Sequence, residues 1–154
     1  MELCEPAPAG TPLGWAPRWE YFQPQNADAT TNEYSGLAAQ VSKLKALALD
    51  RSLLPFGAPP PSESARLYAQ LALNYLAVEE LSPDRIIASA EGGVALCFEL
   101  GEKYADIECL NSGEILGVLS NRRDRPDVWE IEQSTSGVAS AAARIREFIS
   151  ASAA

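Results

Sequence analysis

The chain of 154 residues contains no histidine. Histidine is the commonest general base in catalysis and the commonest metal ligand, so its absence weighs against hydrolases and zinc enzymes. No serine lies in a GxSxG context, and no cysteine has a histidine to activate it. We therefore predict that the protein is not an enzyme and that it has no catalytic residue and no cofactor.

Cysteine is also scarce, and long apolar runs are absent. Cys4, Cys97 and Cys109 are an odd number of thiols without CxxC spacing, which is typical of neither a disulfide framework nor a zinc site. No apolar stretch approaches the roughly 20 residues that span a bilayer, and the first 25 residues lack the pattern of a signal peptide. These absences predict a cytoplasmic protein with free thiols and no membrane partner.

Basic residues are outnumbered, with 12 Lys and Arg against 21 Asp and Glu, for a formal net charge of −9. A negative surface repels phosphate backbones, which nucleic-acid binding meets with clustered basic residues. We therefore predict no direct nucleic-acid partner. The charge is compatible with a basic protein partner, although solubility alone is the simpler explanation of such an excess of acid.

The first 28 residues form a distinct segment that is rich in proline and in aromatic residues. Aromatic side chains are unusual in a solvated tail. They lie here at Trp15, Trp19, Tyr21 and Phe22. One interpretation is an arm that packs these rings on its own domain. The other is a segment that docks on another chain, with these four residues as partner-binding anchors.

Residues 29–154 read as a single α+β domain. Thr30 followed by Glu33 suits a capping box and predicts a helix over 31–50, and Ser62 caps a second helix that ends at Ser82 and Pro83. The apolar stripe of the second helix is predicted from its spacing to include Leu67, Leu71, Tyr75 and Val78. A last helix over 137–150 follows the strands.

Between the helices, apolar runs separated by glycine turns predict an antiparallel meander of about five strands. We expect these strands near 85–89, 93–100, 103–110, 114–120 and 128–132. If Gly101 and Glu102 form a two-residue turn, alternate residues of the second and third strands share one apolar face. The fold class is therefore α+β, with helices packed on one face of the sheet.

The same register assigns side chains to each face of the sheet. The apolar face receives Val94, Leu96, Phe98, Ala105, Ile107 and Cys109, and a turn at Ser112 and Gly113 adds Leu116 and Val118 to it. The opposite face receives Ala95, Cys97, Glu99, Tyr104, Asp106 and Glu108. The two cysteines then lie on opposite faces and do not form a disulfide.

Two charged groups are candidates for binding. The carboxylates of Glu99, Asp106 and Glu108 form a set that suits a hard cation, although alternating acids on a strand are also ordinary solvation. The loop from 121 to 125 carries Arg122, Arg123 and Arg125. Arginine forks suit carboxylate or phosphate groups, so we include these three as partner-binding residues and predict no metal site.

Residues 55–120 resemble a group of small bacterial proteins. In that group a Trp-Asp-Gly-Tyr-type segment precedes a helix and a Gly-Gly or Asp-Gly hairpin that enters an alternating strand. The matching segments here are Pro55-Phe56-Gly57-Ala58-Pro59 and the run from Glu91 to Phe98. The first lacks the Asp and the Trp of the group, and Phe98 stands where Trp is usual. The resemblance implies a small bacterial accessory protein, of which antitoxins and immunity proteins are examples.

Together these observations favour a non-enzymatic protein-interaction module, a small acidic protein that binds a partner protein and neutralises or stabilises it. A carboxylate-dependent metal-binding enzyme using Glu99, Asp106 and Glu108 is the alternative from another class. A plain scaffold subunit of a larger complex lies between them. The sequence leaves the partner and the oligomeric state open.

Overall fold

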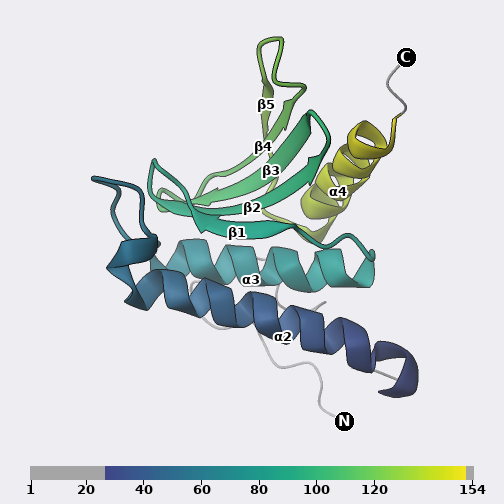
Figure 1. Ribbon diagram of the computed structural model, residues 1–154, viewed down its shortest axis with the longest axis horizontal. Helices are drawn as coiled ribbons and strands as arrows, with labels where there is room; N and C mark the ends of the chain where they lie inside the picture. The colour runs from purple at the N-terminus through teal and green to yellow at the C-terminus, as the bar shows by residue number, and fades with distance from the viewer. Residues whose placement is uncertain (1–26, 152–154) are drawn as a thin grey trace.

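The computed structural model describes residues 27–151. Its elements, drawn in Figure 1, are α2 (Ala27–Leu49), η1 (Arg51–Leu53), α3 (Glu63–Val78), β1 (Arg85–Ala88), β2 (Gly93–Leu100), β3 (Lys103–Leu110), β4 (Ile115–Ser120), β5 (Asp127–Glu130) and α4 (Thr135–Ser150). Within this part of the chain, no helix combines the length and the apolar character needed to cross a membrane.

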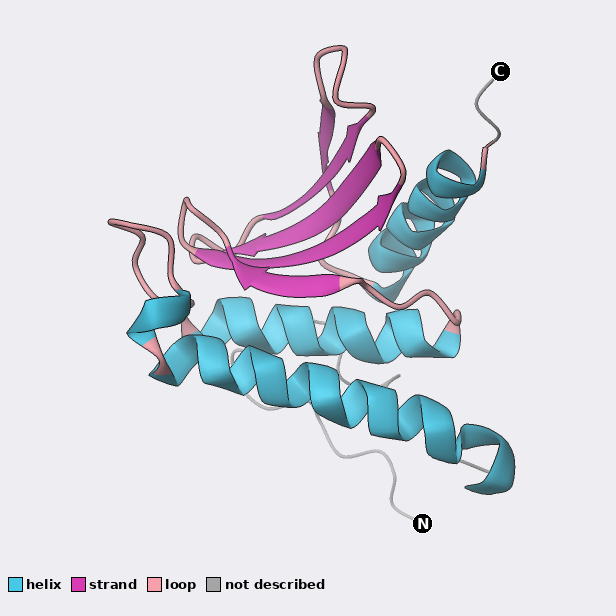
Figure 2. Cartoon of the chain, in the orientation of Figure 1, coloured by secondary structure: helices cyan, strands magenta, loops and turns pink. Residues whose placement is uncertain are grey.

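The five strands form one antiparallel sheet in the order β1-β2-β3-β4-β5. Helix α3 packs against β2 and β3, α4 packs against β3 and β4, and α2 packs against α3 and β1. Their buried side chains join those of one sheet face in a single core cluster. Figure 2 shows the sheet bending from β1, which runs along α3, to β5, which stands away from it. The predicted α+β meander with helices on one face is confirmed.

The helix starts follow capping chemistry in two of the three cases. The Ser62 hydroxyl accepts a hydrogen bond from Ala65 N at 3.1 Å, as predicted, and Ser134 caps α4, which starts two residues earlier than expected. The capping box at Thr30 is wrong, because α2 already begins at Ala27. The predicted stripe of α3 is wrong in part: Leu67 and Val78 are exposed, whereas Leu73 is buried, because α3 lies between α2 and the sheet.

The β2–β3 hairpin has the predicted register. Phe98 pairs with Ala105 and Leu96 with Ile107, across a turn in which Gly101 has a φ of +62°. All four side chains are buried in the core cluster. Cys109 lies on this face as well. Cys97 lies on the other, and both thiols are free.

The β3–β4 register differs from the prediction by one residue. Cys109 pairs with Ile115 and Ala105 with Leu119, so Ile115 and Leu119 join the core, and Leu116 and Val118 lie on the opposite face. The reason is the turn. Leu110 N donates to Glu114 O at 2.9 Å around a three-residue loop whose last residue, Gly113, has a φ of +98°. A one-residue shift of register moves every side chain of a strand to the other face.

Candidate functional site

The sheet face that points away from the helices is the candidate site, and we call it the outer face. An outer face in a two-layer α+β domain is normally solvated. Here three of its apolar residues are buried although they are not part of the core cluster. These residues are Ala95, Cys97 and Leu110. Part of the centre of the outer face is therefore removed from water.

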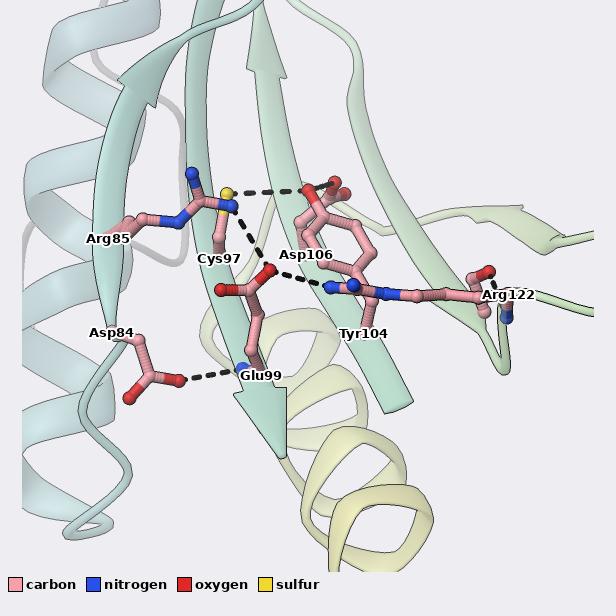
Figure 3. Close-up of polar contacts among 8 residues, drawn as sticks. Asp84, Arg85, Cys97, Glu99, Tyr104, Asp106 and Arg122 are labelled. Carbon is pink, nitrogen blue, oxygen red and sulfur yellow. Dashed lines mark hydrogen bonds and ion pairs between the residues drawn. The ribbon is translucent and has the colours of Figure 1, made fainter. Parts of the chain in front are cut away.

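A short hydrogen-bonded chain crosses the outer face from β2 to β3. The Tyr104 hydroxyl donates to Asp106 Oδ2 at 2.6 Å and lies 3.4 Å from Cys97 Sγ (Figure 3). Cys97 and Asp106 are cross-strand partners, and Tyr104 is two residues before Asp106 on the same side of the strand. Burial raises the pKa of the Tyr104 hydroxyl, and its hydrogen bond to Asp106 raises that pKa further. Tyr104 therefore stays a donor at neutral pH.

Asp106 is the most unusual residue of this chain of contacts. Its side chain is only 5% exposed, and its second oxygen, Oδ1, has no hydrogen-bond partner among residues 27–151. Burial raises the pKa of the Asp106 carboxyl to about 6. The Tyr104 hydroxyl opposes this increase, and the negative charge of Glu108 adds to it. Buried polar atoms without partners are rare, and perturbed carboxyls cluster at functional sites.

Glu108 is the second acidic group at the centre of the outer face. It is half-buried, and the Ser89 hydroxyl donates to its Oε1 at 3.2 Å. Burial raises the pKa of the Glu108 carboxyl, while the Ser89 hydrogen bond lowers it and the charge of Glu91 raises it. Within the described residues, neither Glu108 nor Asp106 forms an ion pair. The centre of the outer face is therefore acidic and lacks a counter-ion.

The basic residues of the outer face are bound to Glu99 instead. Arg85 contacts Glu99 Oε1 at 3.1 Å and Arg122 contacts the same oxygen at 2.8 Å (Figure 3). The Glu99 backbone N–H also donates to Asp84 Oδ2, at 2.7 Å. The Arg122 guanidinium lies over the Tyr104 ring at 5.9 Å from its centre. Glu99 thus organises one end of the face. It leaves Asp106 and Glu108 at the centre, which we call the acidic pair, without a counter-ion.

The three predicted arginines differ in their surroundings. Arg122 is held by Glu99, and Arg123 forms an exposed ion pair of 2.5 Å with Glu102. Arg125 is exposed in the same loop. Two of the three guanidinium groups are thus engaged within the chain, which ties the β4–β5 loop to the β2–β3 hairpin. Their role in partner binding stays a prediction.

The other predicted anchors, Trp15, Trp19, Tyr21 and Phe22, lie outside the described residues, as does Cys4. The described part has an apolar surface of its own, at the connection between α2 and α3. Leu49, Leu53 and Phe56 are exposed there. Phe56 occupies a turn closed by the hydrogen bond from Ala58 N to Pro55 O at 2.9 Å. This surface is a second place where a partner could bind.

The three carboxylates of the metal-site alternative lie on one face but do not converge. Glu99 is bound by arginines, Asp106 by Tyr104 and Glu108 by Ser89. In the part of the chain that the structure describes, no group of three or more Asp, Glu, Cys or His side chains is placed to hold a metal ion. Glu99 therefore belongs to an ion-pair cluster, whereas Asp106 and Glu108 form the acidic pair that has no counter-ion.

Comparisons of the chain with protein-family models, with curated proteins and with solved structures found no match. The resemblance to small bacterial accessory proteins therefore stays a prediction. The function has to be argued from the geometry of the outer face.

Sequence reasoning placed Asp106 on the correct face but took it to be exposed. The missed signal is the identity of its cross-strand neighbours. Asp106 lies between Cys97 and Val118, and Glu108 lies between Ala95 and Leu116. Apolar neighbours on both sides bury a strand carboxylate and offer it no counter-ion. The register error in β4 concealed this pattern, because it assigned Leu116 and Val118 to the core.

We expect the substitution Asp106→Asn to stabilise the protein at neutral pH. The pKa of about 6 in the folded state lies above the ordinary value of 3.8, so the folded protein holds this proton more tightly than the unfolded chain does. The contribution of Asp106 is therefore most favourable below pH 4 and is lost as the pH rises through about 6. At pH 7 the variant should be more stable by about 1 to 3 kcal/mol, and below pH 4 the two proteins should be alike.

Urea unfolding at several pH values measures this difference. Glu114→Gln, in the exposed β3–β4 loop, serves as the control for the loss of a surface carboxylate and should change the stability at pH 7 by less than about 0.5 kcal/mol. A loss of stability in Asp106→Asn at pH 7 would show instead that the folded state favours the charged carboxylate.

Proposed function

We propose that the protein is a non-enzymatic protein-interaction module and that the outer face is its contact surface. The observation that carries this proposal is the acidic pair of Asp106 and Glu108, which is buried or half-buried without a counter-ion. Such a pair reduces the stability of the isolated fold, and this cost is explained if a partner supplies the missing interaction.

An apolar rim around the acidic pair also supports this proposal. Ile87 on β1 and Val128 on β5 are exposed large apolar residues on the two edge strands, and both belong to the outer face by register. Leu116 and Val118 lie partly exposed between the pair and β5. Apolar patches with a few directed polar groups are typical of protein interfaces. A cytoplasmic location and the absence of nucleic-acid binding belong to the same proposal.

Two valines of similar exposure test the contact surface. Val128 on the outer face is 55% exposed, and Val78 at the end of α3 is 50% exposed. The full chain and each variant are immobilised, and proteins retained from a lysate of the source organism are quantified by mass spectrometry. Val128→Gln should reduce the amount of retained partner at least fivefold, because it places an amide in an apolar contact. This reduction corresponds to about 1 kcal/mol of binding free energy. Val78→Gln should retain the partner fully.

A third variant, Phe56→Ser, separates the two exposed apolar surfaces. Binding that is lost with Phe56→Ser and kept with Val128→Gln would move the contact surface to the α2–α3 connection and contradict the assignment to the outer face. An activity that depends on Asp106 and consumes a small molecule would contradict the non-enzymatic function.

A further inference from the structure

The surroundings of the acidic pair restrict what kind of group it can bind. Each carboxylate has apolar side chains on both neighbouring strands, and the guanidinium groups of Arg85 and Arg122 are bound to Glu99. Ionised carboxylates only accept hydrogen bonds. The missing interaction at Asp106 Oδ1 is therefore a donor, and the uncompensated charge requires a cation.

We infer that the outer face receives an arginine or lysine side chain from the partner, with its charged head at Asp106 and Glu108 and its aliphatic stem along Val118 and Leu116. This inference rests on the proposed function and specifies the chemistry of the partner. Long basic side chains combine these two parts, because their methylene groups pack on apolar surface while the head stays polar. The partner segment that presents this side chain is basic, which complements the net charge of −9.

The arrangement of the two acids also indicates how the basic side chain enters. Glu108 is half-buried and accessible, whereas Asp106 is closed off, with the Tyr104 hydroxyl on its Oδ2. The incoming head group contacts Glu108 first, and it reaches Asp106 Oδ1 only when the side chains that cover this buried atom move. Arginine fits best, because its planar group has five donors and bridges two acceptors. A strand-like partner segment also matches Leu116 and Val118, which lie on alternate residues of β4.

A matched pair of peptides tests this inference on the full chain. The probe is acetyl-Val-Arg-Val-amide, and its control carries neutral citrulline in place of arginine. Binding is followed by the backbone amide shifts of the ¹⁵N-labelled protein. The arginine peptide should give saturable shifts along β3 and β4, with an affinity at least tenfold higher than that of the citrulline peptide, because only the arginine peptide carries the counter-ion.

Variants of the pair make the result specific. Asp106→Asn, which is expected to fold stably, and Glu108→Gln should each remove most of the preference for arginine, whereas Glu114→Gln in the exposed loop should keep it. Equal binding of the two peptides, or an unchanged preference for arginine in both variants of the pair, would overturn the inference.

The outcomes also separate this inference from the proposed function. Loss of the partner in Val128→Gln combined with equal binding of the two peptides would leave the outer face as the interface. It would overturn only the inference that the partner inserts a basic side chain there. Specific binding of arginine combined with full retention of the partner by Val128→Gln would support the cation site and contradict the interface.

Discussion

The substitution Gly93→Ala should reduce the free energy of unfolding by about 3 to 5 kcal/mol, through backbone strain and steric overlap acting together. Gly93 has a φ of +140°, which residues with a side chain rarely adopt. A Cβ atom there would lie 2.2 Å from Cys109 O and 2.8 Å from Leu110 Cα. Both atoms belong to the backbone of β3, so the overlap is relieved only if the β2–β3 pairing opens.

Gly101→Ala is the matched control for this prediction. Gly101 also has a positive φ, of +62°, but a Cβ atom there would meet nothing within 4 Å. The substitution Gly101→Ala should reduce the free energy of unfolding by only about 1 kcal/mol, because it introduces the strain of the positive φ without a steric overlap. Thermal and urea unfolding of both variants measure the difference. Equal losses would show that β3 moves aside without cost and that the close approach at Gly93 is not a constraint.

The second large effect is expected at Ile107. Its side chain is 0% exposed, on the core face of β3 between Leu96 and Gly117. Ile107→Ala should reduce stability by about 2 to 5 kcal/mol, because it removes buried methyl groups and leaves a cavity. Phe98→Ala on β2 should act in the same way, because Phe98 belongs to the same cluster.

Ile87 provides the comparison from the other face. It is 37% exposed on β1, and Ile87→Ala should cost less than about 1 kcal/mol. Urea midpoints of the two isoleucine variants compare the faces directly. If Ile87→Ala were the more damaging, the outer face would contribute more to the stability of the domain than the packing of the helices does.

Sequence patterns predicted the fold class and one hairpin register because those features depend on local signals. Gly101 and Glu102 allow a single short turn, and the alternation from Val94 to Cys109 leaves one way to bury the apolar residues. For the β3–β4 turn, the sequence allows more than one loop length. Two-residue and three-residue loops both place a glycine at position 113, and the apolar run from Ile115 to Leu119 can bury either set of its side chains.

The acidic pair of the candidate site could not be predicted for a related reason. The exposure of Asp106 depends on which side chains of β2 and β4 lie beside it and on how far the sheet bends. Neither follows from the spacing of residues along β3. The sequence also does not show that the carboxylates of Glu99, Asp106 and Glu108 fail to converge on one point. Their partners include Arg85, Arg122 and Ser89, which come from other strands or loops.

The meander order of the sheet has a consequence for how fast the protein folds. Every strand pairs with the strand that precedes or follows it in the chain, so the sheet grows by closing one short loop at a time. Short loops close quickly and with little loss of entropy. The contacts that join distant parts of the chain are those of α3 with α4 and those of α2 and α3 with the strands. We expect the hairpins to form early and the docking of the two N-terminal helices to determine the folding rate.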